Sequence, residues 1–184
     1  MLPVGTRHTP SILGLILVVI PTIVIAFYVI VSLTTGDWLW FNPTFAETPR
    51  AIFVHCYGKT IEIEPGSYHF SAVTKIVNKA LSGRKRWDSL SLSTATYQDY
   101  QTHPKMAALE LFYHEPVRIH TSYKFFSGVD NLVIPLDGRH AETRAVFGLN
   151  RGVPTAGSLH LETIKPIQEY LRNQKICPIE VSKH

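Results

Sequence analysis

The hydropathy pattern is dominated by one unbroken apolar run, residues 11–33, which contains no charged side chain. At a rise of about 1.5 Å per residue this run spans roughly 34 Å as a helix, enough to cross a hydrocarbon core about 30 Å thick. It is longer than the apolar core of a signal peptide, roughly 7–15 residues, and no clear small-residue cleavage site follows it. The pattern therefore predicts a retained transmembrane helix over 11–33.

Aromatic side chains are concentrated directly after this run. They are Trp38, Trp40, Phe41 and Phe45. Amphipathic rings favour the headgroup level of a bilayer, so residues 34–50 are interpreted as an interfacial linker. Contact of the same rings with a partner subunit is the alternative.

The charges on either side of the run indicate its orientation. The short segment 1–10 carries the amino group and Arg7, whereas the flank at 34–50 carries two acidic residues and one basic residue. Because positive charge is retained on the cytoplasmic side, we expect a cytoplasmic N-terminus and an extracytoplasmic domain over 51–184.

The first part of that domain has the pattern of a hairpin followed by a helix. Two β-branched, partly alternating runs, 51–57 and 60–64, are separated by a turn at Gly58. Apolar residues then recur at helical spacing between a capping Ser67 and a terminating Gly83.

The second part is rich in predicted strands. Residues 84–104 are polar and irregular, with a short strand expected around Leu90, Leu92 and Tyr97. Further strands are predicted at 107–113, 117–120, 131–136, 144–149 and 158–162, and a final helix at 165–173. Strands and about two helices in blocks favour a single α+β domain with a mostly antiparallel sheet.

Charge and cysteine content narrow the choice of partners. A net charge of +4 over 184 residues is too small to indicate nucleic-acid binding, so the expected partners are the lipid bilayer and other membrane proteins. Cys56 and Cys177 either form one disulfide in an oxidising compartment or remain two buried thiols. His55 is adjacent to Cys56, but neighbours in a strand point to opposite faces, which argues against a catalytic pair.

One polar loop is the strongest candidate for chemistry. Asp137, Arg139, His140 and Glu142 follow a predicted strand and would bind an anion or a metal if their side chains converged. A glycine-containing turn with solvated charges is the simpler interpretation. The sequence lacks the H-E-x-x-H, C-x-x-C, G-x-S-x-G and P-loop motifs, so it predicts no cofactor.

Four histidines lie in or beside predicted strands: His55, His114, His120 and His160. No two have the spacing of a recognised zinc pair, so the sequence predicts no metal site and scattered, hydrogen-bonded histidines are expected.

The densest basic cluster is Arg84, Lys85 and Arg86, followed by Trp87. Cations beside an indole suit anionic headgroups or an acidic partner. Placed after a helix C-terminus, the same cations would also complement the helix dipole and then face water.

These observations favour a non-enzymatic, single-pass membrane protein whose external domain binds another protein, as an accessory or assembly subunit of a membrane complex. A membrane-tethered sensor or small-ligand-binding domain is the second hypothesis. A tethered hydrolase or metal-dependent enzyme that uses the loop with Asp137, His140 and Glu142 is the third.

Overall fold

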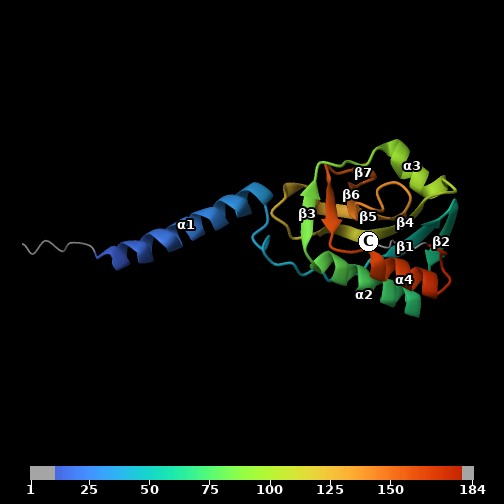
Figure 1. Cartoon of the computed structure of the whole chain (residues 1–184), viewed down its shortest axis with the longest axis horizontal. Coiled ribbons are helices and arrows are strands. Elements are labelled where there is room, and N and C mark those ends of the chain that lie inside the picture. Colours follow the sequence, from blue (N-terminus) through green and yellow to red (C-terminus); the bar gives the residue numbers. More distant parts are fainter. Residues whose placement is uncertain (1–10, 180–184) are drawn as a thin grey trace, which may run out of the picture.

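The computed structural model describes residues 11–179. A long N-terminal helix leads into a domain in which an antiparallel sheet is covered by helices on both faces (Figure 1). The segment 1–10, which contributes to the expected orientation, lies outside the described residues.

Helix α1, Ile12–Thr35, confirms the helix expected over 11–33; it begins one residue later and ends two residues later. The Ser11 hydroxyl accepts a hydrogen bond from the Gly14 N–H at 3.1 Å and caps the start of the helix. Gly36 ends it in the left-handed conformation, with φ 67°. The mean hydropathy of its most apolar window is 2.9 and none of that window is buried. By length and composition, α1 is therefore able to cross a membrane.

The domain is built on eight antiparallel strands in the order β2-β1-β4-β5-β6-β8-β3, with β7 paired to β6. Their bounds are β1 Ala51–Cys56, β2 Lys59–Ile63, β3 Lys85–Asp88, β4 Ala107–Arg118, β5 Ser127–Asp137, β6 Ala145–Asn150, β7 Val153–Pro154 and β8 Ser158–Leu161. The edges of the sheet are thus β2 and β3. Strand β3 lies on the side of the domain that faces α1 (Figure 1).

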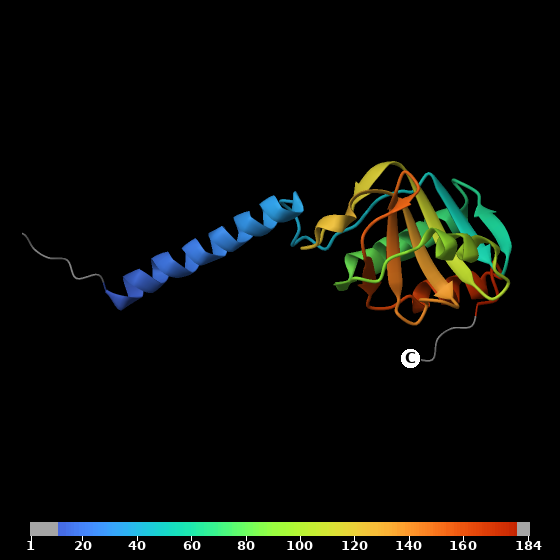
Figure 2. The same cartoon turned by 90° about the horizontal axis from the view of Figure 1, so that it is seen from above.

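One face of the sheet carries the larger core. Helices α2, Tyr68–Ser82, and α4, Lys165–Asn173, pack against it side by side (Figure 2). Alternate residues of the strands, such as Ile52 and Val54, point into this core. The Ser67 hydroxyl caps α2 through the Phe70 N–H at 3.1 Å, as the sequence predicts.

The opposite face is covered by α3, Thr94–Thr102, which the sequence did not indicate. Tyr100 of this helix packs with Ala108 and Phe147 of the sheet. The strand expected around Leu90, Leu92 and Tyr97 is therefore wrong, because Tyr97 is helical; within residues 51–179 the domain has three α-helices, where about two were expected.

Two further local predictions are corrected. The strands expected at 107–113 and 117–120 form one long strand, β4, in which a change of register between Phe112 and Val117 accommodates Pro116. The basic run at 84–87 follows helix α2, as expected, but it largely forms edge strand β3 within the region 84–104 that was expected to be irregular.

Cys56 and Cys177 are joined by a disulfide with a Cα–Cα distance of 5.8 Å. The bond ties the end of β1 to the segment that follows α4, across 121 residues of sequence. Both cysteines belong to the larger core, and the neighbouring His55 points to the other face of the sheet, where it contacts Glu110.

Candidate functional site

The connection between α1 and the domain is held by a buried carboxylate. Asp37 is only 6% exposed and accepts hydrogen bonds from the Leu39 N–H at 2.9 Å and from His120 Nδ1 at 2.8 Å. The Arg118 guanidinium, from the end of β4, donates to the Gly36 carbonyl. Because the domain supplies partners to the end of the helix, α1 and the sheet are linked by specific contacts and not only by chain connectivity.

The predicted interfacial aromatic residues lie beside the last turns of α1. Trp38 and Phe41 contact Tyr28 at ring-centroid distances of 5.9 and 6.0 Å, and Trp40 contacts Phe27 at 6.0 Å. The Tyr28 hydroxyl donates to the Trp38 carbonyl at 2.9 Å. The chain therefore folds back along the helix, and these five rings form one aromatic group at its C-terminal end.

Phe45 does not belong to this group. It is 4% exposed and packs edge-on against Tyr113 in the larger core, with ring centroids 6.3 Å apart. Its backbone N–H donates to the Ser82 hydroxyl at 2.9 Å. The prediction of an interfacial position for Phe45 is wrong because the linker has already joined the domain core at this residue.

A pocket of about 230 Å³ opens beside the aromatic group, and we call it the junction pocket. It is lined by Trp40, Phe41, Pro43, Gly83, Arg84, Lys85, His120, Thr121, Ser122 and Tyr123. Residues from the linker, the start of β3 and the loop after β4 thus meet at the C-terminal end of α1.

A second pocket, of about 470 Å³, adjoins the first, and we call it the basic pocket. It is lined by Arg84, Lys85, Arg86, Arg144, His160, Leu161 and Glu162. Pairing of β3 with β8 sets Arg86 opposite His160, and pairing of β6 with β8 brings Arg144 to the same place. The predicted basic run is therefore joined by two further nitrogen side chains that no local pattern indicated.

The Lys85 side chain is hydrogen-bonded to the backbone of neighbouring segments. Its ammonium group donates to the carbonyls of Leu81, Gly83 and Pro43, the last at 3.4 Å. The contact with Leu81 satisfies one carbonyl at the end of α2, as expected for a cation that complements a helix dipole. Burial lowers the pKa of Lys85 from its ordinary value.

The pKa of His160 is lowered by its surroundings in the basic pocket. Burial lowers its pKa, and the charges of Arg86 and Arg144 lower it further, while Asp88 acts in the opposite direction. The nearest carboxylate oxygen, Asp88 Oδ2, is 3.5 Å from His160 Nε2. The imidazole therefore favours its neutral form at neutral pH, beside three arginines.

The candidate loop after β5 does not gather its side chains at one point. Asp137 accepts a hydrogen bond from the Tyr57 hydroxyl at 2.5 Å. Arg139 and His140 both turn toward α3, where His140 Nδ1 lies 2.8 Å from the Tyr100 hydroxyl. Glu142 is exposed on the other side of the loop. The hydrolase or metal hypothesis requires Asp137, His140 and Glu142 to converge, and these side chains lie apart.

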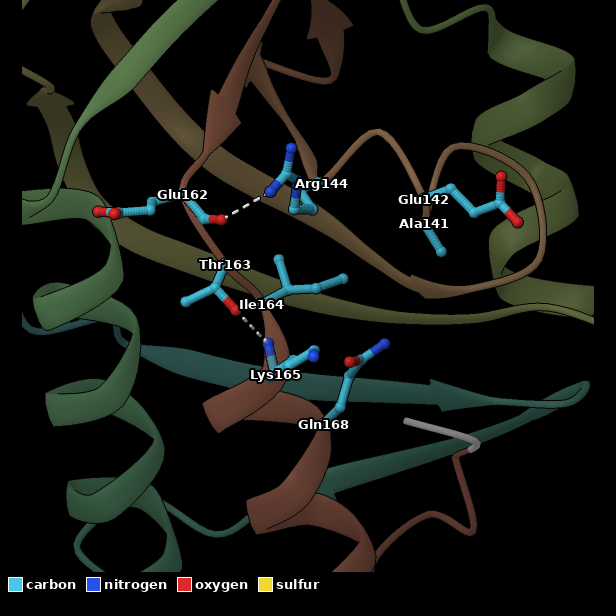
Figure 3. A pocket seen from close by; sticks show the side chains of 8 residues that line it. All are labelled: Ala141, Glu142, Arg144, Glu162, Thr163, Ile164, Lys165 and Gln168. Atoms are coloured by element: carbon cyan, nitrogen blue, oxygen red, sulfur yellow. Dashed lines mark hydrogen bonds between the residues drawn. The ribbon is translucent and has the colours of Figure 1, made fainter. Parts of the chain in front are cut away.

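Glu142 instead lines a separate pocket of about 300 Å³ near the start of α4 (Figure 3). Its carboxylate points away from Arg144, whose guanidinium donates to the Glu162 carbonyl at 2.8 Å. Gln168 closes the inner wall and donates to the Leu136 carbonyl at 2.7 Å. The charged groups here are mostly engaged with the backbone or with solvent.

The sequence reasoning missed a buried polar network under α3. Glu110, 2% exposed, accepts hydrogen bonds from the Tyr97 hydroxyl at 2.5 Å and from Asn131 Nδ2 at 2.6 Å, and lies 2.7 Å from His55 Nε2. Burial alone would raise the pKa of Glu110, but the hydrogen bonds from His55, Tyr97 and Asn131 outweigh it and lower the pKa. The signal in the sequence was a carboxylate, Glu110, within the otherwise apolar strand predicted at 107–113.

The four histidines near strands have different partners. His55 contacts Glu110, His120 contacts Asp37, and His160 lies near Asp88, whereas the fourth, His114, is exposed. Within residues 11–179, the structure forms no group of three or more His, Cys, Asp and Glu side chains placed to hold a metal.

Comparisons with known proteins return no relative. No family model matches the chain, and neither a curated protein nor a solved structure matches it. The functional argument therefore depends on the geometry described above.

Proposed function

We propose that this chain is a single-pass membrane protein with a cytoplasmic N-terminus, whose extracytoplasmic domain serves as an accessory or assembly subunit by binding another protein of the same membrane. The observation that carries the proposal is the contact between the anchor helix and the domain through Asp37, Arg118 and His120. These contacts give the domain a defined orientation relative to α1.

A defined orientation matters for recognition within a membrane. A partner in the same bilayer meets the domain from one direction, so less orientational freedom is lost on binding than with a flexible tether. The side chains of α1 are largely exposed, which leaves them available to lipid or to a neighbouring helix. Among residues 11–179, β2 and β3 are the outer strands of the sheet, and an outer strand is where a partner strand can add.

The disulfide supports the location of the domain. Disulfides persist in oxidising compartments and are rare in the cytosol. A domain closed by Cys56–Cys177 is therefore best suited to the extracytoplasmic side, which agrees with the charge distribution around α1.

Extraction of the native protein in a mild detergent, followed by native mass determination and identification of co-purifying proteins, tests the proposal. A defined particle with at least one other membrane protein is the expected result. The variant Asp37→Ala, which removes the buried contact to His120, should weaken the association, whereas Asp130→Ala, at an exposed hairpin contact, should not. A solitary monomer in the unmodified protein would refute the proposal.

A further inference from the structure

We propose that the basic pocket and the junction pocket together bind the phosphate-bearing headgroup of an anionic lipid. This inference rests on the proposed membrane anchoring, because it requires the pockets to lie at the bilayer surface. It goes further by assigning a ligand class to the residues that line these two pockets.

The position of the two pockets is the first argument. The junction pocket includes Trp40 and Phe41, members of the aromatic group that packs beside the last turns of α1. Lys85 Nζ, which lies in both pockets, is 3.4 Å from the Pro43 carbonyl. Pro43 follows Phe41 by two residues, a reach of at most about 7 Å. The cations therefore lie next to the aromatic group, at the level where lipid phosphates are found.

The charge of the pockets is the second argument. Among the described residues, Arg84 and Arg86 form no ion pair with a carboxylate. Lys85 donates only to carbonyl groups, so its charge is not neutralised by an acid. Glu162 is the single carboxylate in the lining of either pocket. An anion with several acceptor oxygens suits the guanidinium donors of Arg84 and Arg86, and the charge of Lys85 adds to its attraction.

The surroundings of the pockets favour a lipid over a soluble anion. Trp38, Leu39 and Phe41 are about half exposed, at 54%, 49% and 59%, and Phe41 lines the junction pocket together with Arg84 and Lys85. An amphiphile satisfies both features at once, since its phosphate contacts the arginines while its acyl chains cover the rings. The basic pocket, at about 470 Å³, is within the range of roughly 300–1,000 Å³ that is usual for small-ligand sites.

Native mass spectrometry of the full chain in detergent, titrated with phosphatidylglycerol or phosphatidylcholine, tests this inference. We expect phosphatidylglycerol to bind at least tenfold more tightly. The double variant Arg84→Gln, Arg86→Gln should weaken its binding roughly 25-fold, since each basic residue near a surface contributes about fivefold. The matched double variant Lys59→Gln, Lys75→Gln removes the same charge from exposed positions away from the pockets and should change the affinity less than twofold.

The other outcomes are distinct. Equal binding of phosphatidylglycerol to the wild type and the arginine variant would overturn the inference. Displacement of the lipid by millimolar inorganic phosphate would identify a site for a free anion and not for a lipid. Loss of a co-purifying protein from the arginine variant, with lipid binding unchanged, would assign the surface to an acidic partner. Because lipid binding is measured on the isolated chain, it does not depend on whether a protein partner is found.

Discussion

Removal of the Cys56–Cys177 disulfide should destabilise the domain strongly. The bond closes a loop across 121 residues, for which the chain-entropy relation gives about 5 kcal/mol at room temperature. Measured effects are commonly about 2–4 kcal/mol. We therefore expect the double variant Cys56→Ala, Cys177→Ala to lose about 2–5 kcal/mol of unfolding free energy. Alanine is preferred over serine because both sulfurs lie in the apolar core.

The location of Cys177 explains why the loss should spread beyond the bond. Cys177 and Ile179 are buried in the larger core, and the Cys177 N–H donates to the Leu171 carbonyl at the end of α4 at 3.2 Å. Without the covalent link, this terminal segment is retained by packing and a few hydrogen bonds. We expect its amide protons to exchange faster, in addition to the global loss of stability.

Urea unfolding of the full chain in detergent, followed by near-ultraviolet circular dichroism, measures the change. A decrease of about 2–4 °C in Tm per kcal/mol is expected at this chain length, so thermal melts should show a decrease of roughly 4–20 °C. Equal urea midpoints for the variant and the oxidised wild type would refute the entropic argument. Rapid alkylation of freshly lysed cells adds a separate test, because free thiols at both positions would contradict the proposed extracytoplasmic location.

Three further substitutions test other parts of the structure. Glu110→Gln should lower stability by about 2–3 kcal/mol at neutral pH. Because the pKa of Glu110 is lowered from 4.5 in the folded state, its stabilisation is complete above that value and is lost as pH falls through the lowered pKa. The difference in unfolding free energy between wild type and variant, measured by urea titration, should therefore become smaller in acid. A difference that does not change with pH would contradict the network. Asp37→Ala should broaden the distance distribution between spin labels on α1 and on the sheet, because the domain loses its His120 contact to the end of the helix; an unchanged width would mean that the carboxylate does not couple them. Gly157→Ala should destabilise by about 1–3 kcal/mol more than Gly152→Ala. Both glycines have φ 78°, but a Cβ at 157 would lie 2.5 Å from a β3 backbone oxygen, whereas at 152 nothing lies within 4 Å. Equal melting temperatures of the two variants would exclude the clash.

Local signals predicted a large part of the fold. The charge-free run predicted α1, and the capping Ser67 with a helical apolar period predicted α2. These elements depend on contacts between residues close in sequence, so the pattern of side chains is sufficient to indicate them. Helix α3 was missed because only Thr96 and Tyr100 are buried along it, which leaves almost no apolar period.

The candidate site likewise contains residues that the sequence indicates and residues that only the fold brings together. The basic run and the aromatic residues at 38–41 are visible in the sequence because their members are neighbours. Phe45 is indistinguishable from them by composition, yet its contact with Tyr113 in β4 places it in the core. Nothing within the run 84–87 indicates that Arg144 and His160 complete the basic pocket, because their approach depends on pairing between strands far apart in sequence.

The sequence by itself determined an apolar helix able to cross a membrane and an α+β domain with an antiparallel sheet, since both follow from local hydropathy and turn residues. Only the tertiary structure decided which cations share a pocket, that the two cysteines meet, and that Glu110 is buried among hydrogen-bond donors. The pocket and the position of Glu110 depend on strand register, and a shift of one residue would turn the same side chains to the opposite face; the cysteines meet because the segment after α4 packs against the end of β1. Register is set by packing over the whole sheet, which no short stretch of sequence contains.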